Sequence, residues 1–261
     1  MNVNFETIIL EKKGAIQSLI FNRPKELNTI TFQLIDEINS ALQLLRKDEE
    51  IIVLIITGTD KTFMAGADLK IVKNSNYLQM RKYLGAIQEM LTQIEDLEIP
   101  VIAAINGHAM GGGFELICSC DFRIMSESAL LGFPEIKLGS IPGASATSRL
   151  LRIVGQSKAA EIIMLGNNLT AQEALNLNLV NKVVPSGEVQ SVAFQLAEEL
   201  AKCPPLALKL AKKAINLGYD TDVKTARRYA LEAMALTIVT NDMKEGLNAF
   251  FEKRQPIFKG N

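Results

Sequence analysis

The stretch that decides the fold reads VIAAINGHAMGGGFELICSCDFRI and covers residues 101–124. Its first five residues, 101–105, are all apolar, which is typical of a strand buried on both faces of a parallel sheet. Asn106 and Gly107 end this strand, and three consecutive glycines then precede an apolar helical pattern that starts near Phe114. A buried strand that leads through a glycine loop into a helix predicts an α/β fold.

The rest of the chain extends this pattern. Residues 15–21 and 51–57 read as further strands, and residues 31–46 carry apolar side chains at helical spacing. After about residue 143 the pattern becomes helix upon helix. We therefore predict an α/β core over residues 1–200 and an α-helical region over residues 201–261, with no low-complexity linker. The later helices are expected over residues 150–154, 159–165, 171–177, 189–202, 206–217 and 246–251.

Composition and charge exclude several classes of protein. Of 261 residues, 48% are hydrophobic and 22% are charged, which is ordinary for a globular protein. The net charge of −1 gives no broad positive field, so neither nucleic acid nor an anionic membrane is expected as a partner. Residues 1–11 lack the basic start and apolar run of a signal peptide, and no apolar stretch approaches the roughly 18 residues that span a bilayer. A cytoplasmic location is therefore predicted.

Cysteine and histidine are too few for a metal centre. Cys118 and Cys120 lie two residues apart in an apolar segment, without the spacing of a metal-binding pair, and read as buried free thiols. His108 is the only histidine, which excludes a multi-histidine site. We expect no metal site.

The glycine loop at residues 111–113 is the first candidate site. Glycines let a ligand atom approach the main chain without meeting a Cβ, and the first N–H groups of the following helix have no partner within it. The positive end of the helix dipole also favours a negative oxygen, which makes Gly112 a candidate donor. A tight turn or a close helix crossing is the alternative explanation for the glycines.

A second loop of small residues, FMAGAD at residues 63–68, follows the strand predicted over residues 51–57. It again places small residues just past a strand end. Two backbone donors from two loops are what the enolate of a thioester requires, and neither loop suffices alone.

Two glutamates accompany these loops. Glu115 lies in the first turn of the helix after the glycines, and Glu135 lies twenty residues later in GFPEIKLGSIPG, residues 132–143. Paired carboxyl groups that converge on one site can hold a water molecule, one accepting its proton while the other donates a proton to carbon. Taken singly, Glu115 is explained by the helix dipole and Glu135 by an exposed loop. Spacing in the sequence does not decide whether the two converge.

At these residues the chain resembles the enoyl-CoA hydratase/isomerase (crotonase) family, over essentially its whole length. The resemblance implies a crotonase (ClpP-like) α/β fold, a spiral of ββα repeats, with an α-helical C-terminal trimerisation region. A homotrimer or a homohexamer is then expected. Five motifs stand in the family's order: FNRPKELN at 21–28, FMAGADLK at 63–70, AAINGHAMGGGFEL at 103–116, FPEIKLGSIPGA at 133–144 and KEGLNAFFEKRQPIFKG at 244–260.

The resemblance also implies roles for residues. Ala67 and Gly112 would give the two N–H donors to the thioester oxygen. Glu115 and Glu135 stand where hydratases keep both catalytic glutamates, which favours hydration of a trans-2-enoyl-CoA to a 3-hydroxyacyl-CoA. Glu115 would be the base, because the helix terminus favours its ionised form, and Glu135 would be the acid. Coenzyme A is then part of the substrate, and no metal or redox cofactor is needed.

Binding of coenzyme A is expected along the same comparison. The main chain around Lys25 and Ala65 would hold the adenine end. Lys70 and Lys253 would approach the phosphates, Lys253 from a neighbouring subunit, and lysine suits this as a flexible point charge. A solvated surface lysine is the alternative at each position.

Some positions near the site depart from the family or lack a clear role. Ser145 and Ala146 stand where many hydratases have Gly-Gly, which is expected to reshape the acyl pocket, whereas Gly143 is kept and lets the loop pack closely. His108 stands near the glycine loop and is a candidate for contact with the thioester, with a packed strand-end histidine as the alternative. Residues 71–85 are polar enough to be mobile and, by the resemblance, line the acyl pocket.

Three further charged residues are read as structural. Asp68 and Asp121 are expected to hold loop or helix termini. Arg149 is most simply a charge on a helix surface or at an interface.

Other functions stay open. An enoyl-CoA isomerase of the same family would use Glu135 alone, and a polyketide-type dehydratase or decarboxylase would act on a carrier-protein thioester. An RNA-binding or scaffold protein would need a basic helix face, whereas residues 31–50 carry two basic residues against five acidic ones.

Overall fold

Two β-sheets form the centre of the computed structural model, which describes residues 5–59 and 61–261. In the larger sheet all neighbouring strands are parallel except the first two. In spatial order it consists of β1 (Ile8–Lys13), β2 (Ile16–Phe21), β3 (Val53–Thr57), β5 (Val101–Ile105), β7 (Phe122–Ser126) and β10 (Lys182–Val184). The smaller sheet consists of β4 (Thr62–Met64), β6 (His108–Met110), β8 (Leu130–Gly132) and β9 (Leu169–Thr170), of which only β8 and β9 are antiparallel.

The two sheets are built by one repeated unit. Each of β3, β5 and β7 in the larger sheet is followed in the chain by a short strand of the smaller sheet, β4, β6 and β8 respectively, and then by helix. This arrangement confirms the expected spiral of strand, strand and helix. It also brings the ends of β4, β6 and β8, where the candidate residues lie, to one region of the molecule.

A helix is present at every segment for which the apolar periodicity predicts one. Thr31 caps the first helix, since its side chain accepts a hydrogen bond from the N–H of Leu34. The α-helices are α1 (Phe32–Leu45), α2 (Leu69–Asn74), α3 (Tyr77–Glu95), α4 (Gly112–Cys118), α5 (Ala146–Val154), α6 (Gln156–Leu165), α7 (Ala171–Asn176), α8 (Val189–Ala201), α9 (Pro205–Asp220), α10 (Val223–Thr237) and α11 (Asn241–Glu252). Two 3-10 helices, η1 (Pro24–Glu26) and η2 (Pro134–Leu138), complete the set.

The central strands of the larger sheet are buried on both faces, as the apolar runs predict. Every residue of β3 and of β5 is buried. Leu54 and Ile56 face the main core with α1, α3 and α4, whereas Val53 and Ile55 face a second cluster formed with α8. The alternation follows from the period of two along a strand.

The segment at residues 71–85 is helical in the structure. It comprises most of α2 and the first half of α3, which begins with a capping box in which Asn76 and Gln79 each bond to the backbone of the other. The capping box starts this helix despite the polar composition of the segment. Its polar residues lie on the outer face of α3, while Tyr83, Ile87 and Met90 enter the core.

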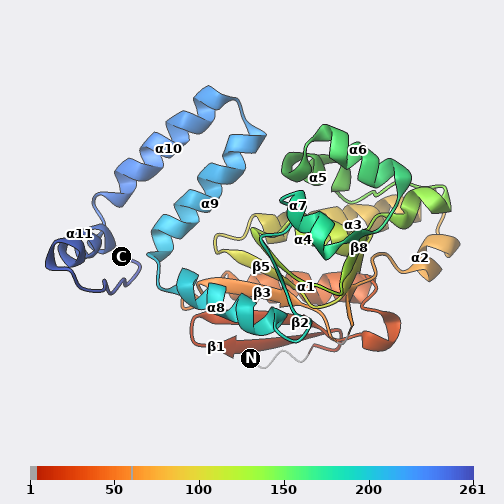
Figure 1. Cartoon of the computed structure of the whole chain (residues 1–261), viewed down its shortest axis with the longest axis horizontal. Coiled ribbons are helices and arrows are strands. Elements are labelled where there is room, and N and C mark those ends of the chain that lie inside the picture. Colours follow the sequence, from red (N-terminus) through yellow and green to blue (C-terminus); the bar gives the residue numbers. More distant parts are fainter. Residues whose placement is uncertain (1–4, 60) are drawn as a thin grey trace.

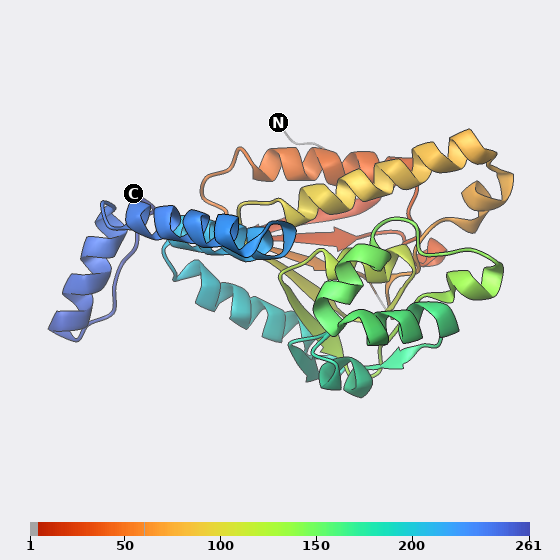
Figure 2. The ribbon, with the colours of Figure 1, turned by 90° about the horizontal axis from the view of Figure 1, so that it is seen from above.

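The predicted helical region at residues 201–261 contains α9, α10 and α11. Figures 1 and 2 show α10 and α11 projecting away from the sheets, at the opposite end of the molecule from α2. Along the described ranges 5–59 and 61–261, no helix has the length and apolar character needed to cross a membrane. The first four residues of the segment 1–11 lie outside the described residues.

Candidate active site

Two loops touch at the start of α4. One follows β4 and contains Gly66, and the other follows β6 and contains Gly111. A Cβ on Gly66 would lie 2.7 Å from the carbonyl oxygen of Met110 and 2.9 Å from the nitrogen of Gly112. Gly66 also has a φ of +90°, so glycine alone allows this approach.

The contact places two backbone donors side by side. A Cβ built on Gly112 would lie 3.8 Å from the nitrogen of Ala67. Within the described part of the chain, neither the N–H of Ala67 nor that of Gly112 makes a hydrogen bond. For Gly112 the reason is general, because the first N–H groups of a helix have no partner inside it.

Glu115 is held by three backbone donors. It lies one turn into α4, is only 3% exposed, and points toward the turn before α5. Its Oε1 accepts hydrogen bonds from the N–H groups of Ala144 (2.9 Å), Ser145 (2.6 Å) and Ala146 (2.8 Å). These bonds leave Oε2 without a partner among the described residues.

Burial raises the pKa of Glu115, because desolvation penalises its charged form. The three backbone N–H groups and the charge of Arg149 act in the opposite direction and favour the carboxylate. The carboxyl group is therefore buried and still supplied with donors for its ionised form.

Glu135 reaches the same end of α4 from the short helix η2. A Cβ on Gly111 would lie 2.5 Å from Glu135 Oε1, so the carboxyl group rests against this glycine, whose φ is +51°. Glu135 Oε2 is buried and has no hydrogen-bond partner among the described residues. Burial raises the pKa of Glu135 to about 7, and the nearby charge of Glu115 adds to this.

Together the two N–H donors and the two carboxyl groups form the candidate site, and each kind of group is suited to a different chemical task. The unpaired N–H groups of Ala67 and Gly112 are suited to an oxygen that gains negative charge. Glu115 and Glu135, on either side of the start of α4, are suited to accept and donate protons near that oxygen. An unpaired buried carboxyl oxygen such as Glu135 Oε2 is rare unless a ligand or a reaction uses it.

The turn that holds Glu115 is itself fixed to α3. Gln88 donates a hydrogen bond from Nε2 to the carbonyl oxygen of Gly143 (2.8 Å). Arg149 donates from Nε to Glu95 Oε2 (2.8 Å) and from Nη2 to Thr92 Oγ1 (3.2 Å).

Of the two roles expected for Arg149, a charge on a helix surface or at an interface, the structure supports the second, at a contact between two helices of the chain. Arg149 is 9% exposed and pairs with Glu95 across the interface between α3 and α5. No local pattern indicates this pair, because its two members are far apart in the chain. Gln88, Thr92 and Glu95 are spaced three to four residues apart, which places them on one face of a helix. This spacing is the one feature of the sequence that indicates a common role.

Not every predicted residue lies at this candidate site. Lys25 and Lys70 are exposed residues of η1 and α2, and the loops that carry them are joined by a bond from the Ala65 N–H to the carbonyl oxygen of Leu27 (3.0 Å). Lys253 follows α11, which Figures 1 and 2 place at the other end of the molecule. Within one chain Lys253 is therefore remote from the site.

The other predicted positions have structural contacts. His108 is exposed, and its Nδ1 accepts a hydrogen bond from the Leu130 N–H (3.1 Å), so its contacts do not join it to the glutamates. Asp68 caps α2, and Asp121 accepts from the Val101 N–H, as expected of residues that hold termini. Gly143 packs against α3.

Cys118 and Cys120 are buried free thiols, and burial raises the pKa of each to about 12. No group of three or more histidine, cysteine, aspartate or glutamate residues is placed to hold a metal ion in the described ranges. The candidate chemistry of this region thus centres on the two glutamates and the two main-chain donors.

Comparison with known proteins matches this architecture along the whole chain. The sequence profile of the family described as Enoyl-CoA hydratase/isomerase matches residues 11–261. The chain is 44% identical to a probable mitochondrial enoyl-CoA hydratase of Dictyostelium discoideum, covering 97% of this chain and 91% of that protein. It is 39% identical to a short-chain-enoyl-CoA hydratase of Clostridium acetobutylicum, covering 97% of each.

The fold agrees with the sequence comparison. A crystal structure of an enoyl-CoA hydratase from Bacillus anthracis superposes with a TM-score of 0.95 at 40% identity, covering 98% of this chain and 100% of that one. These matches far exceed a likeness of fold alone. The chain belongs to the enoyl-CoA hydratase/isomerase (crotonase) family.

Proposed function

We propose that the protein is an enoyl-CoA hydratase, which adds water reversibly to a trans-2-enoyl-CoA to give a 3-hydroxyacyl-CoA. The observation that carries this proposal is the pair of carboxyl groups, Glu115 and Glu135, at the start of α4 beside two unpaired backbone N–H groups. Hydration needs both a base for water and an acid for carbon, and the chain supplies one carboxyl group for each.

In the proposed reaction the thioester oxygen lies between the N–H groups of Ala67 and Gly112. These donors withdraw electrons from the conjugated system, so the β-carbon becomes electrophilic. Glu115 takes a proton from water as the water oxygen bonds to the β-carbon, and Glu135 gives its proton to the α-carbon of the enolate. A second proton transfer from Glu115 to Glu135, through solvent, restores the starting state.

The environments of the two glutamates support this division of roles. Three N–H donors on Glu115 Oε1 stabilise its ionised form, which is the form a base requires. Glu135 has a pKa of about 7 and a buried oxygen without a donor, so it holds its proton at neutral pH more readily than an ordinary glutamate. A protonated carboxyl group is the form an acid requires.

The contribution of each group to the reaction rate can be estimated from other enzymes. Loss of one donor to the oxygen costs about 2.7 to 4 kcal/mol in barrier height. Loss of one proton-transfer group lowers the rate by about 100- to 10,000-fold.

The test is hydration of crotonyl-CoA, followed by loss of absorbance of the conjugated double bond. Glu115→Gln and Glu135→Gln keep the shape of each side chain and should each lower kcat by at least about 100-fold. Glu127→Gln, an exposed glutamate after β7, is the matched control and should leave the rate unchanged. Hydration that survives Glu115→Gln unchanged would refute the proposed mechanism.

An isomerase is the second candidate, because it needs one carboxyl group to move a proton between carbons, and the buried Glu135 Oε2 has no hydrogen-bond partner among the described residues. Conversion of a 3-enoyl-CoA to the 2-enoyl-CoA should be measured with the same variants. Isomerisation faster than hydration, and retained in Glu115→Gln, would assign the protein to this activity.

Binding of the coenzyme A moiety is proposed along the joined loops that carry Lys25, Ala65 and Lys70. The exposed ammonium groups support contacts with phosphate, and Lys253 would take part only from a neighbouring subunit. Lys25→Ala and Lys70→Ala should raise KM for crotonyl-CoA and leave KM for crotonyl-pantetheine, which lacks the nucleotide, unchanged. Equal activity on both thioesters in the unaltered protein would instead favour a carrier-protein substrate.

A trimer or a pair of trimers is proposed for the C-terminal helices. Helices α9 to α11 carry large apolar side chains that are more than half exposed in one chain, which supports burial against other copies. Light scattering during size-exclusion chromatography would measure the mass of the assembly. These side chains include Ile215, Leu231, Met234, Leu236, Phe250 and Phe251.

A cytoplasmic location completes the proposal. The relative in Dictyostelium discoideum is described as mitochondrial, so cell fractionation with an antibody to the protein is the deciding measurement.

A further inference from the structure

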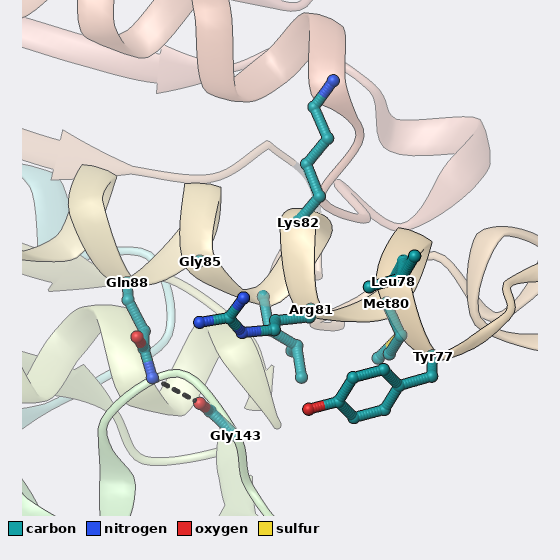
Figure 3. Close-up of a pocket in the computed structure, with 9 residues that line it drawn as sticks. Tyr77, Leu78, Met80, Arg81, Lys82, Gly85, Gln88 and Gly143 are labelled. Carbon is teal, nitrogen blue, oxygen red and sulfur yellow. Dashed lines mark hydrogen bonds between the residues drawn. The ribbon is translucent and has the colours of Figure 1, made fainter.

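A cavity of about 640 Å³ lies along the outer face of α3 and reaches Gly143. Gly143 directly precedes Ala144, whose N–H bonds to Glu115 Oε1. Figure 3 shows α3 along one side of this cavity and the Gly143 loop on the other, joined by the hydrogen bond from Gln88. The cavity therefore adjoins the turn that holds one catalytic carboxyl group.

A glycine in the middle of α3 keeps this cavity open. Gly85 lies within a 19-residue helix, where glycine costs roughly 1 kcal/mol relative to alanine. A Cβ built on Gly85 would meet no atom within 4 Å, so close packing does not explain the residue. The space above Gly85 is instead part of the cavity.

The lining of the cavity combines apolar side chains with two cationic residues, Arg81 and Lys82. Leu78, Met80 and Leu84 supply apolar surface. Arg81 makes no hydrogen bond and no ion pair within the described residues. Figure 3 shows its guanidinium group extending along the helix toward Gln88 and Gly143, with the hydroxyl of Tyr77 also directed into the cavity.

An unpaired guanidinium group here is suited to one kind of ligand group. Its planar N–H groups match the two oxygens of a carboxylate, and such charge-assisted pairs are stronger than neutral hydrogen bonds. Gln88 Nε2 bonds to Gly143, and Figure 3 shows Lys82 pointing away from this residue. Among the described lining residues, Arg81 and Tyr77 are therefore the polar side chains on the Gly143 side that have no hydrogen-bond partner. A purely alkyl ligand would use neither.

We propose that the protein prefers enoyl-CoA substrates whose acyl chain ends in a carboxylate, the monothioesters of unsaturated dicarboxylic acids. This inference rests on the proposed hydratase function and names its substrate class. The acyl chain extends from the glutamates past Gly143 into the cavity, where Arg81 pairs with the terminal carboxylate and Tyr77 donates a hydrogen bond to it.

The experiment compares 2-hexenedioyl-CoA with 2-hexenoyl-CoA, which have equal chain length and differ in the terminal group. The unaltered protein should show a kcat/KM at least about tenfold higher for the dicarboxylate. Arg81→Met should remove this preference and leave the rate on 2-hexenoyl-CoA unchanged or higher. Lys82→Met is the matched control, since Figure 3 shows Lys82 pointing away from Gly143, and it should keep the preference.

Each outcome separates the inference from the function on which it rests. Hydration of 2-hexenoyl-CoA with a ratio that Arg81→Met does not change overturns the inference and leaves the hydratase function intact. If neither thioester is hydrated, the proposed function fails. Calorimetric binding of the saturated adipoyl-CoA and hexanoyl-CoA then tests the Arg81 site alone, and equal affinities would overturn it as well.

Discussion

The ring of Phe114 stacks on the ring of Phe133, with centroids 4.3 Å apart and planes only 5° from parallel. Both rings are fully buried. Phe114 directly precedes Glu115, and Phe133 lies two residues before Glu135, so one aromatic contact joins the two segments that carry the glutamates. The stack packs the start of η2 against α4 and so contributes to the relative position of the two carboxyl groups.

The first prediction follows from this stack. Phe133→Leu leaves a cavity beside Phe114 and should lower the free energy of unfolding by about 1 to 2 kcal/mol. The looser position of Glu135 should also lower kcat for crotonyl-CoA by about tenfold, measured where the variant is fully folded. Phe21→Leu, an equally buried residue of β2, should lose stability without losing kcat. Equal effects on kcat would show that the stack has no positioning role.

Much of the core was predictable because its signals are local. The apolar run at β5 and the helical spacing of α1 each decide a structure within a few residues, and both elements lie where they were predicted. The start of α3 was also readable, since Asn76 and Gln79 form the capping box of a helix. The polar composition of the surrounding residues does not by itself indicate this helix.

The smaller sheet was not predictable from local pattern. Strands β4, β6 and β8 have three residues each, which is too short for a period of two to appear. These strands set where the N–H groups of Ala67 and Gly112 lie, so the meeting of the two loops is a tertiary result. The same holds for Arg149 and Glu95, whose contact depends on how α5 crosses α3.

The second prediction concerns the pH dependence of activity. Hydration requires protonated Glu135 and ionised Glu115. Dehydration requires protonated Glu115 and ionised Glu135, so the pair carries one proton in both directions. The overall reaction takes up no net proton, so kcat/KM should follow one bell-shaped profile in both directions. Loss of the proton from Glu135, with a pKa of about 7, places the alkaline limb near pH 7.

That profile is measured from pH 5 to 9 with crotonyl-CoA and with 3-hydroxybutyryl-CoA. A profile that is flat through pH 7, or limbs that differ between the two directions, would contradict the assigned pair. Glu127→Gln should reproduce the profile of the unaltered protein, because Glu127 is exposed and belongs to neither loop.

The third prediction concerns stability and pH. The folded pKa of Glu135, about 7, exceeds the ordinary value of 4.5, so the folded state keeps a proton that the unfolded state releases. Stability should therefore fall as pH rises from 4.5 to 7 and then level off. Glu135→Gln removes this dependence and should gain on the order of 1 to 2 kcal/mol over the unaltered protein at pH 8, after allowance for solvent screening.

Urea unfolding at pH 5 and pH 8 measures this difference. The advantage of Glu135→Gln should be small at pH 5 and near its full size at pH 8. An advantage that does not change with pH would mean that Glu135 titrates normally in the folded protein.

The fourth prediction concerns the pair of Arg149 and Glu95. Arg149→Gln leaves a partly buried carboxylate unpaired and should lower stability by about 1 to 3 kcal/mol. It should also lower kcat, because Arg149 lies on the helix whose first turn holds Glu115 and because its charge favours ionised Glu115. Arg152 lies on α5 with Arg149 and pairs with Asp220, the last residue of α9. Arg152→Gln breaks this more exposed pair and is the control. If both variants lower kcat equally, the effect belongs to α5 in general.

The fifth prediction tests the two main-chain donors by adding a methyl group beside them, which narrows the site without changing any charge. In Gly112→Ala the new methyl group would lie 2.7 Å from Ile30 Cδ1, a flexible side-chain end, and 3.8 Å from the Ala67 nitrogen. Ile30 can rotate, so stability should change little, whereas the space between the two donors narrows.

The expected result for Gly112→Ala is a fall in kcat/KM for crotonyl-CoA of about 100-fold, the effect of losing one donor. Gly218→Ala in α9 is the matched control, because its methyl group meets nothing within 4 Å. It should gain about 0.5 to 1 kcal/mol in stability from helix propensity and keep full activity. A methyl group beside the N–H groups of Ala67 and Gly112 would hinder binding of the thioester oxygen between them. Full activity in Gly112→Ala would therefore show that the thioester oxygen binds elsewhere.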